Sequence, residues 1–343
     1  MNSPFCNLLP KTYSGGFQEV WYLKLNNPAS DRALWLRFTL LLSKNGFRKI
    51  SETWAIYFHR NENKEISKLA LKETFSLESF QTLPQGIKIN SCELSDTHTR
   101  GKIQSKGNSL EWDFEMKNLF PARGQSKPPS GSFDFVPPLL ARLGLVKNKA
   151  LTVFENLAFT GSCTVNGEKF EWKNAPGMQG HLAGPKNGHS WVWGHCNFFL
   201  DESGTPVPFI FEGISAKSRI GNYFSSPKMS SFYFYYRGEE IRLNSLWSVL
   251  RSRSQNSLTE WNFQADTNEL SFRGQVKSEL RNFAGVTYED TDGSFLYCAN
   301  SKLSEMSVHV FRNNKLESSF HSPRTTAFEM VSRQKSPYVP LLL

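Results

Sequence analysis

The 343-residue sequence lacks the patterns of a secreted or membrane-spanning protein. It has five cysteines, none in a CxxC pair, and an odd number cannot pair completely within one chain. No charged-then-apolar leader opens the sequence, so reduced thiols in a cytoplasmic setting are expected. Apolar runs fall far short of the ~20 residues of a membrane-spanning helix. A disulfide-rich secreted domain and a helical membrane protein are therefore not predicted.

Motifs for phosphate binding, serine hydrolysis and nucleic-acid binding are also lacking. There is no glycine-rich phosphate loop and no GxSxG turn. Lys and Arg outnumber Asp and Glu by 40 to 31, but they are scattered singly, as on a solvated surface. We expect no cofactor and no nucleic-acid partner. Peripheral contact with an anionic membrane, through the more basic first half, stays an alternative, and the oligomeric state is not predicted.

Strand-forming segments fill most of the chain. Aromatic and branched residues dominate Phe17–Leu25, Ala33–Leu42 and Thr53–His59, and turn-forming residues separate these segments. Asn166-Gly167 between two β-prone pairs is typical of a tight hairpin. Helical periodicity is confined to a short turn at Leu139–Leu145. An all-β chain of barrels or sandwiches is predicted, and its length favours two domains at about 150 residues each.

The stretch from Gly180 to Phe199, GHLAGPKNGHSWVWGHCNFF, is the most unusual part of the sequence. Its second half is predicted as a strand, in which alternate side chains share a face. One face would carry four residues that combine aromatic planes with polar tips: Trp191, Trp193, His195 and Asn197. Such a face is typical of a pocket for a mostly apolar ligand. A buried strand with a hydrogen-bonded core histidine is the alternative.

The histidines and Cys196 do not form a recognisable metal or nucleophile motif. The spacings from His181 to His189 and from His189 to His195 are longer than the tight pairs of structural zinc sites. Cys196 would face away from His195, so that His195 could not serve it as a base. We therefore predict no metal site.

Three carboxylates in apolar surroundings are candidates for acid chemistry. Glu19 lies in the first strand near Trp21, Glu52 lies beside Trp54, and Glu212 lies within PFIFEG. Burial would raise their pKa values and retain a proton at neutral pH. The alternative for each is a charge at a strand end, exposed or paired with an arginine.

Several segments together resemble a known group of proteins. The region from Gly161 to Trp193, GSCTVNGEKFEWKNAPGMQGHLAG…WVWGHCNFF, is similar to the signature of tocopherol cyclase, of the carotenoid 1,2-hydratase (hydroxyneurosporene synthase) family and of AttH-like lipocalin-type proteins. EVWYLKLNNP and WAIYFHR resemble the first-domain strands of this group. The chain departs from the signature at Ala183, where the group usually has Trp.

The resemblance implies two lipocalin-like antiparallel β-barrel domains side by side. We place them at residues 1–180, with a proline-rich segment at 121–149, and at 181–343. It also implies isoprenoid or polyene substrates and cofactor-independent chemistry, in which a double bond is protonated and then takes up water or closes a ring. The expected catalytic residues are His195, His181, Glu19 and Glu212, and the expected ligand-binding residues are Trp191, Trp193, Asn197, His189 and Trp21.

Two functions of different classes follow. The first is an enzyme that hydrates, cyclises or isomerises a hydrophobic ligand, with a protonated His or a buried Glu as acid and tryptophan faces stabilising a carbocation. The second is a carrier or sensor that holds such a ligand unchanged.

Overall fold

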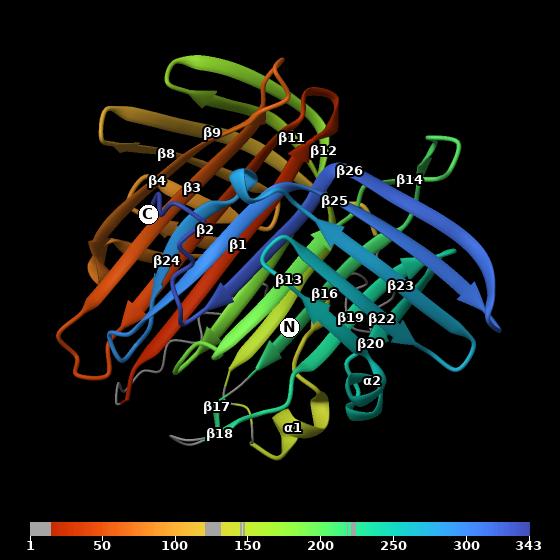
Figure 1. Cartoon of the computed structure of the whole chain (residues 1–343). Coiled ribbons are helices and arrows are strands. Elements are labelled where there is room, and N and C mark those ends of the chain that lie inside the picture. Colours follow the sequence, from red (N-terminus) through yellow and green to blue (C-terminus); the bar gives the residue numbers. More distant parts are fainter. Residues whose placement is uncertain (1–14, 121–131, 145, 147, 218, 221–223) are drawn as a thin grey trace.

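The chain folds into two large antiparallel β-sheets, shown in Figure 1. The computed structural model describes residues 15–120, 132–144, 146, 148–217, 219–220 and 224–343. Cys6, residues 121–131 of the proline-rich segment and residues 145 and 147 lie outside these ranges. The predicted all-β fold is confirmed, and the two sheets form a lipocalin-like architecture.

Sheet A curls into a nearly closed barrel. Its strand order is β4-β3-β2-β1-β12-β11-β9-β8-β7-β6-β5, and β10 pairs with β11. The strands are β1 (Phe17–Asn27), β2 (Arg32–Leu42), β3 (Lys49–Arg60), β4 (Ile66–Ser76), β5 (Phe80–Leu83), β6 (Gly86–Ile89), β7 (Cys92–Ser95), β8 (His98–Ser105), β9 (Asn108–Asn118), β10 (Phe133–Asp134), β11 (Lys149–Val165) and β12 (Glu168–Gly184).

Sheet B has the order β20-β19-β16-β13-β26-β25-β23-β22-β21, with β14, β15 and β24 attached at its sides. Its strands are β13 (Ser190–Cys196), β14 (Phe199–Leu200), β15 (Pro206–Val207), β16 (Ile210–Lys217), β19 (Met229–Tyr236), β20 (Glu239–Leu243), β21 (Arg253–Asn256), β22 (Glu260–Asp266), β23 (Leu270–Lys277), β24 (Ala284–Glu289), β25 (Phe295–Arg312) and β26 (Lys315–Ser332).

Helices are short in the part of the chain that the structure describes. They are α1 (Pro138–Arg142), α2 (Leu246–Arg251) and three 3₁₀ turns at Pro28–Ser30, Leu77–Ser79 and Leu280–Asn282. A two-stranded ribbon pairs β17 (Arg219–Ile220) with β18 (Phe224–Ser225). None of the described helices is long and apolar enough to span a bilayer.

The local predictions for the early strands, the hairpin and the short helix are confirmed. The three early segments form β1, β2 and β3, which extend one to five residues in all beyond the predicted limits. Asn166 and Gly167, with φ of 49° and 89°, form the tight turn between β11 and β12. Both residues have the positive φ that this turn requires. The predicted helical turn is α1.

Strand alternation divides the interior into three apolar cores. One fills barrel A and includes Trp21, Leu23 and Leu36. Another fills the concave side of sheet B and includes Val192 and Cys196. The third lies between the sheets, where Val20 and Tyr22 of β1 share a cluster with Trp193 of β13. Because successive residues of a strand point to opposite faces, β1 and β13 each contribute to two cores.

Candidate functional site

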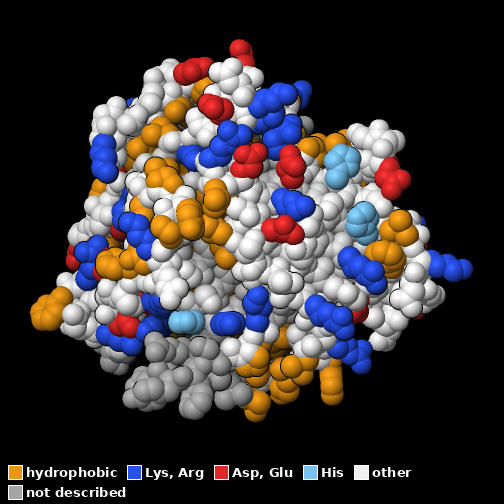
Figure 2. All heavy atoms as spheres, viewed as in Figure 1, with side chains coloured by type: hydrophobic (Ala, Val, Ile, Leu, Met, Phe, Trp, Pro, Cys, Tyr) orange, Lys and Arg blue, Asp and Glu red, His pale blue; other side chains and the backbone are white. Residues whose placement is uncertain are grey.

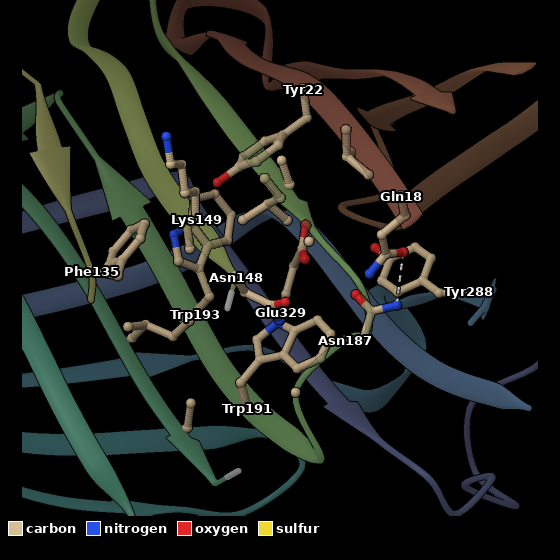
Figure 3. Close-up of a pocket in the computed structure, with 18 of the residues that line it drawn as sticks. Gln18, Tyr22, Phe135, Asn148, Lys149, Asn187, Trp191, Trp193, Tyr288 and Glu329 are labelled. Atoms are coloured by element: carbon tan, nitrogen blue, oxygen red, sulfur yellow. Dashed lines mark hydrogen bonds between the residues drawn. The ribbon is translucent and has the colours of Figure 1, made fainter. Parts of the chain in front are cut away.

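A cavity of about 150 Å³ opens between the two sheets, within the third core. Its walls come from β1, β2 and the end of β12 on one side, and from β13, β16, β24 and β26 on the other. The aromatic lining consists of Tyr22, Trp35, Phe135, Trp191, Trp193 and Tyr288. The polar lining includes Gln18, Arg37, Asn148, Lys149, Asn187 and Glu329 (Figure 3). An apolar cleft with a few convergent polar groups is the usual form of a small-molecule site.

The register of the strands explains which side chains reach the cavity. In β13, Trp191 lies opposite Ala216 and Trp193 opposite Ile214, and all four line the cavity. Val192 and Cys196 point instead into the core of sheet B. The predicted alternation of this strand is therefore present in the fold, and it brings both indole rings to the cavity.

The aromatic side chains of the cavity wall contact one another, and one of them, Trp35, has an indole N–H that a ligand could satisfy. Tyr22 packs edge-on against Trp193, with ring centroids 5.7 Å apart. The Trp35 indole N–H is buried and has no hydrogen-bond partner among the described residues. Arg37 lies over the Tyr288 ring at 4.1 Å. A buried donor without a partner costs stability unless a ligand or water satisfies it.

Glu329 is the one acidic side chain among the described residues that line the cavity. Its Oε1 accepts hydrogen bonds from Lys302 Nζ at 2.7 Å and from Asn300 Nδ2 at 3.2 Å. Lys302 is fully buried, and burial lowers its pKa, while the charge of Glu329 opposes that shift. Figure 3 shows Glu329 among Tyr22, Trp193 and Tyr288. The carboxylate is thus held in place at the wall of an aromatic cavity.

A second pair of carboxyl groups lies behind the Trp193 wall. Trp193 Nε1–H donates to Glu212 Oε1 at 2.9 Å, and the Thr152 hydroxyl donates to Oε2 at 2.6 Å. Burial raises the pKa of Glu212, against the hydrogen bonds that it accepts. Burial, and then the charge of Glu212, raise the pKa of Glu155 well above 4.5. Burial therefore favours the protonated form of both carboxyl groups.

Tyr22 links this pair to the cavity electrostatically. Burial raises the pKa of its phenol well above 10, and among the nearby charges that of Glu212 contributes most. The phenol is therefore neutral and can donate a hydrogen bond to a ligand in the cavity that it lines.

His195 is buried beside the carboxyl pair and does not line the cavity. Its Nε2–H donates to the main-chain carbonyl of Glu155 at 3.0 Å, and Nε2 lies 3.7 Å from the Glu155 carboxyl group. Burial, and then the charge of Lys24, lower the pKa of His195 well below 6.5. The imidazole is therefore neutral at physiological pH, and its Nδ1 lacks a hydrogen-bond partner among the described residues.

Glu19, His181 and Trp21 lie together inside barrel A, on the other side of the sheet from the cavity. His181 Nε2 is 3.0 Å from Glu19 Oε1, and its ring stacks on Trp21 at 5.2 Å. The reason is that β12 runs to Gly184 and pairs with β1, so that His181 faces Trp21. The structure therefore separates His181 and Glu19 from Trp191 and Trp193.

The other predicted ligand-binding residues also lie outside the cavity lining. Asn197 Nδ2 donates to Asn156 Oδ1 and to the Gly177 carbonyl, each at 3.0 Å, and so ties the two sheets together. The backbone N–H of His189 donates to the Lys217 carbonyl, in the loop before β13. Ala183, where the family signature has Trp, pairs with Glu19 and borders the cavity.

Sequence reasoning missed Tyr22, Lys302 and Glu329. Glu329 lies between Phe328 and Met330 in a strand, which is the kind of apolar setting that singled out Glu212. Lys302 is a charged residue in the interior of the long strand β25, and such a position is an equivalent signal of a buried charge. Both residues carry a signal of a buried charge, but that Glu329 and Tyr22 line one cavity depends on how the sheets pack.

The side chains of the described ranges include no group of three or more His, Cys, Asp or Glu residues arranged to hold a metal ion. The described cysteines Cys92, Cys163, Cys196 and Cys298 are buried and free.

Comparison with solved structures shows the fold. CghA superposes with a TM-score of 0.55 and 9% identity over 98% of this chain and 94% of that chain. Kievitone hydratase from Nectria haematococca superposes with a TM-score of 0.50 and 11% identity, over 96% of this chain and 94% of that chain. A putative AttH from Nitrosomonas europaea superposes with a TM-score of 0.49 and 12% identity over 92% of each chain. No protein-family model and no curated protein matches the sequence. The chain therefore shares the overall fold of CghA and kievitone hydratase, whereas membership of the family expected from the sequence stays a prediction.

Proposed function

We propose that the protein binds a hydrophobic small molecule of isoprenoid or polyene type between its two sheets and transforms it by acid-catalysed hydration, cyclisation or isomerisation. The observation that carries the proposal is an aromatic cavity that contains one carboxylate, Glu329, held by the buried Lys302. Aromatic faces and a fixed carboxylate both stabilise positive charge that develops in a transition state.

The size of the cavity limits which part of a ligand it encloses. A volume of about 150 Å³ corresponds to roughly one benzene-sized group. The reacting double bond or ring would lie between Trp193 and Tyr288. The rest of a longer ligand would extend past Asn148, Lys149 and Asn187, which supply polar groups at the cavity wall.

The proton would come from the Glu155 and Glu212 pair, which burial keeps protonated. A water molecule in the cavity would carry it to one carbon of the double bond, because burial and the charge of Glu212 raise the pKa of Tyr22 well above 10 and make its phenol too weak an acid for this step. His195 would be a positioning residue, because its neutral ring donates to the Glu155 carbonyl and is a poor acid.

In the remaining steps, Glu329 would stabilise the carbocation and accept the proton that is released. Protonation leaves a carbocation on the second carbon, which the indole faces and the Glu329 carboxylate stabilise. In hydration, a water oxygen bonds to that carbon and the resulting oxonium gives its proton to Glu329. In isomerisation or ring closure, a neighbouring C–H bond breaks and Glu329 takes that proton. Either proton then returns to the carboxyl pair through water.

Two of the similar structures agree with this proposal. One is named a hydratase, and CghA is known with Sch210972 in a second structure that superposes with a TM-score of 0.53 at 8% identity. The sequence resemblance to tocopherol cyclase and carotenoid hydratase points to the same reaction class.

The test is incubation with polyprenyl and polyene compounds in D₂O, followed by mass spectrometry. Acid addition predicts a product with one deuterium on carbon. Glu329→Gln keeps the side-chain shape but removes the charge, and should lower turnover by about 10²-fold or more. His195→Ala tests the positioning role, and Glu62→Gln on the exposed surface is the matched control. Turnover that is equal in Glu329→Gln and wild type would exclude Glu329 from the reaction.

The second candidate function is carriage of the ligand without reaction. It is favoured by the position of the protonated carboxyl pair behind Trp193 rather than in the cavity lining. Mass spectrometry of a solvent extract of freshly purified protein separates the two. One unmodified hydrophobic compound that stays unchanged on long incubation supports carriage, whereas its conversion supports an enzyme.

A further inference from the structure

Two short helices expose large apolar side chains at one end of the molecule. Trp247 and Leu250 of α2 are 74% and 70% exposed. Leu139 of α1 and Leu143, its C-terminal cap, are 49% and 61% exposed. Most large apolar side chains of the described residues are buried, and four of the eleven exposed ones lie in these two elements. Such clustering marks an interaction surface.

Hydrogen bonds hold the bases of the two helices together. Asn244, just before α2, donates from Nδ2 to the carbonyl of Asp134, four residues before α1, at 2.6 Å. Ser231 of β19 donates to the Phe135 carbonyl at 2.9 Å. Figure 1 shows both helices at the same end of the molecule. The exposed residues therefore form one surface, the α1–α2 surface: Leu139, Leu143, Trp247 and Leu250.

The two segments that carry the α1–α2 surface contain basic residues and no acidic ones, and the nearest acidic side chain along the chain is the exposed Asp134 at the base of α1. Residues 136–150 and 244–258 contain no Asp or Glu. Arg142 and Arg251 end the two helices, and both are exposed together with Lys149 and Arg253. Figure 2 shows apolar side chains at the lower edge of the molecule, where Figure 1 has the helices, with Lys and Arg side chains beside them.

We propose that the α1–α2 surface docks on an anionic membrane. Tryptophan favours the boundary between lipid headgroups and acyl chains, and leucine the acyl region below it. Arginines beside them meet the negative surface potential of acidic lipids. The sequence of the two segments agrees, because neither residues 136–150 nor residues 244–258 contain an acidic side chain that would repel the headgroups.

The position of this surface connects docking to the cavity, a link that rests on the proposed function. Phe135, three residues before α1, and Lys149, at the start of β11, both line the cavity. A ligand dissolved in the bilayer could thus pass from the membrane to the cavity without crossing water.

The experiment is co-sedimentation of the full chain with phosphatidylcholine vesicles, with and without about one third phosphatidylserine. Binding should require the anionic lipid and weaken as salt is raised. Trp247→Ser combined with Leu250→Ser should reduce the partition coefficient about tenfold or more. Phe47→Ser, which removes another exposed ring (91% exposed), is the matched control and should bind as wild type does.

A second measurement keeps the test independent of folding and of turnover. The tryptophan fluorescence of wild type should shift to shorter wavelength on vesicle addition and be quenched by brominated lipid, in protein without ligand, and Trp247→Ser, which keeps the other eight tryptophans, should lose this change. Equal sedimentation of the double variant and wild type, or the absence of quenching, would overturn the proposal. Self-association of the wild type that the double variant loses, without vesicle binding, would assign the surface to a second copy of the chain instead. Neither result depends on the reaction proposed for the cavity.

Discussion

Lys302 Nζ and Glu329 Oε1 lie 2.7 Å apart, joining adjacent strands β25 and β26 at the wall of the cavity. The Lys302 side chain is fully buried and that of Glu329 is 9% exposed. Lys302 also lies 5.5 Å from the ring centroids of both Trp35 and Trp193. One buried cation thus fixes the carboxylate and contacts both indole walls.

Removing this cation should leave the Glu329 carboxylate buried without an opposing charge, with Asn300 as a remaining hydrogen-bond donor. Lys302→Met is expected to destabilise the fold by about 3–5 kcal/mol in urea unfolding, because an unpaired buried charge is costly. The double variant Lys302→Met, Glu329→Gln should recover part of that loss, since no charge is left. A Lys302→Met variant as stable as wild type would show that the pair does not hold the site together.

Lys24 is expected to cost stability at neutral pH. It is fully buried, its Nζ has no hydrogen-bond partner within the described ranges, and burial lowers its pKa from 10.5 to about 8. The unfolded chain therefore binds this proton more tightly, and the penalty is full below pH 8 and disappears as pH rises towards 10.5. Lys24→Met should stabilise the protein at pH 7 by about 3 kcal/mol, and the gain should shrink at higher pH. Urea unfolding of both proteins at pH 7 and pH 9.5 measures this; a loss of stability at pH 7 would contradict it.

Glu155 should make stability fall as pH rises. Burial, and then the charge of Glu212, raise its pKa well above 4.5, so the folded state keeps a proton that the unfolded state releases. Stability is therefore lost from about pH 4.5 up to the folded-state pKa, with a slope approaching 1.4 kcal/mol per pH unit. Glu155→Gln should flatten this slope between about pH 5 and 7, whereas the exposed Glu62→Gln should leave it unchanged. Parallel curves for Glu155→Gln and wild type would refute the assignment.

Local patterns in the sequence predicted much of the fold. Aromatic and branched runs located β1, β2 and β3, and Asn166-Gly167 located a hairpin whose positive φ values need those residues. Alternation along β13 predicted that Trp191 and Trp193 face one way and Val192 and Cys196 the other. These features depend on neighbours within a few residues, which a single sequence shows directly.

The composition of the site depended on contacts between distant residues. Tyr22 and Glu329 come from opposite ends of the chain and meet only because β1 packs against sheet B. His181 was grouped with His195 because they are close in sequence, yet β12 carries His181 into barrel A. When both faces of a strand are buried, no local pattern shows which face packs against a second sheet.

The most direct test of the account is binding of a hydrophobic probe to wild type and to Ala216→Phe, measured by calorimetric titration with a ten-carbon isoprenoid alcohol. Ala216 lies opposite Trp191 and borders the cavity, so a phenyl ring there would occupy much of its volume. Lys217→Phe places the same ring on the next, exposed residue of β16 and is the matched control. The account predicts one site with a negative heat-capacity change in wild type and Lys217→Phe, and affinity reduced about tenfold or more in Ala216→Phe. Equal binding by all three proteins, or none by wild type, would contradict a ligand site between the sheets.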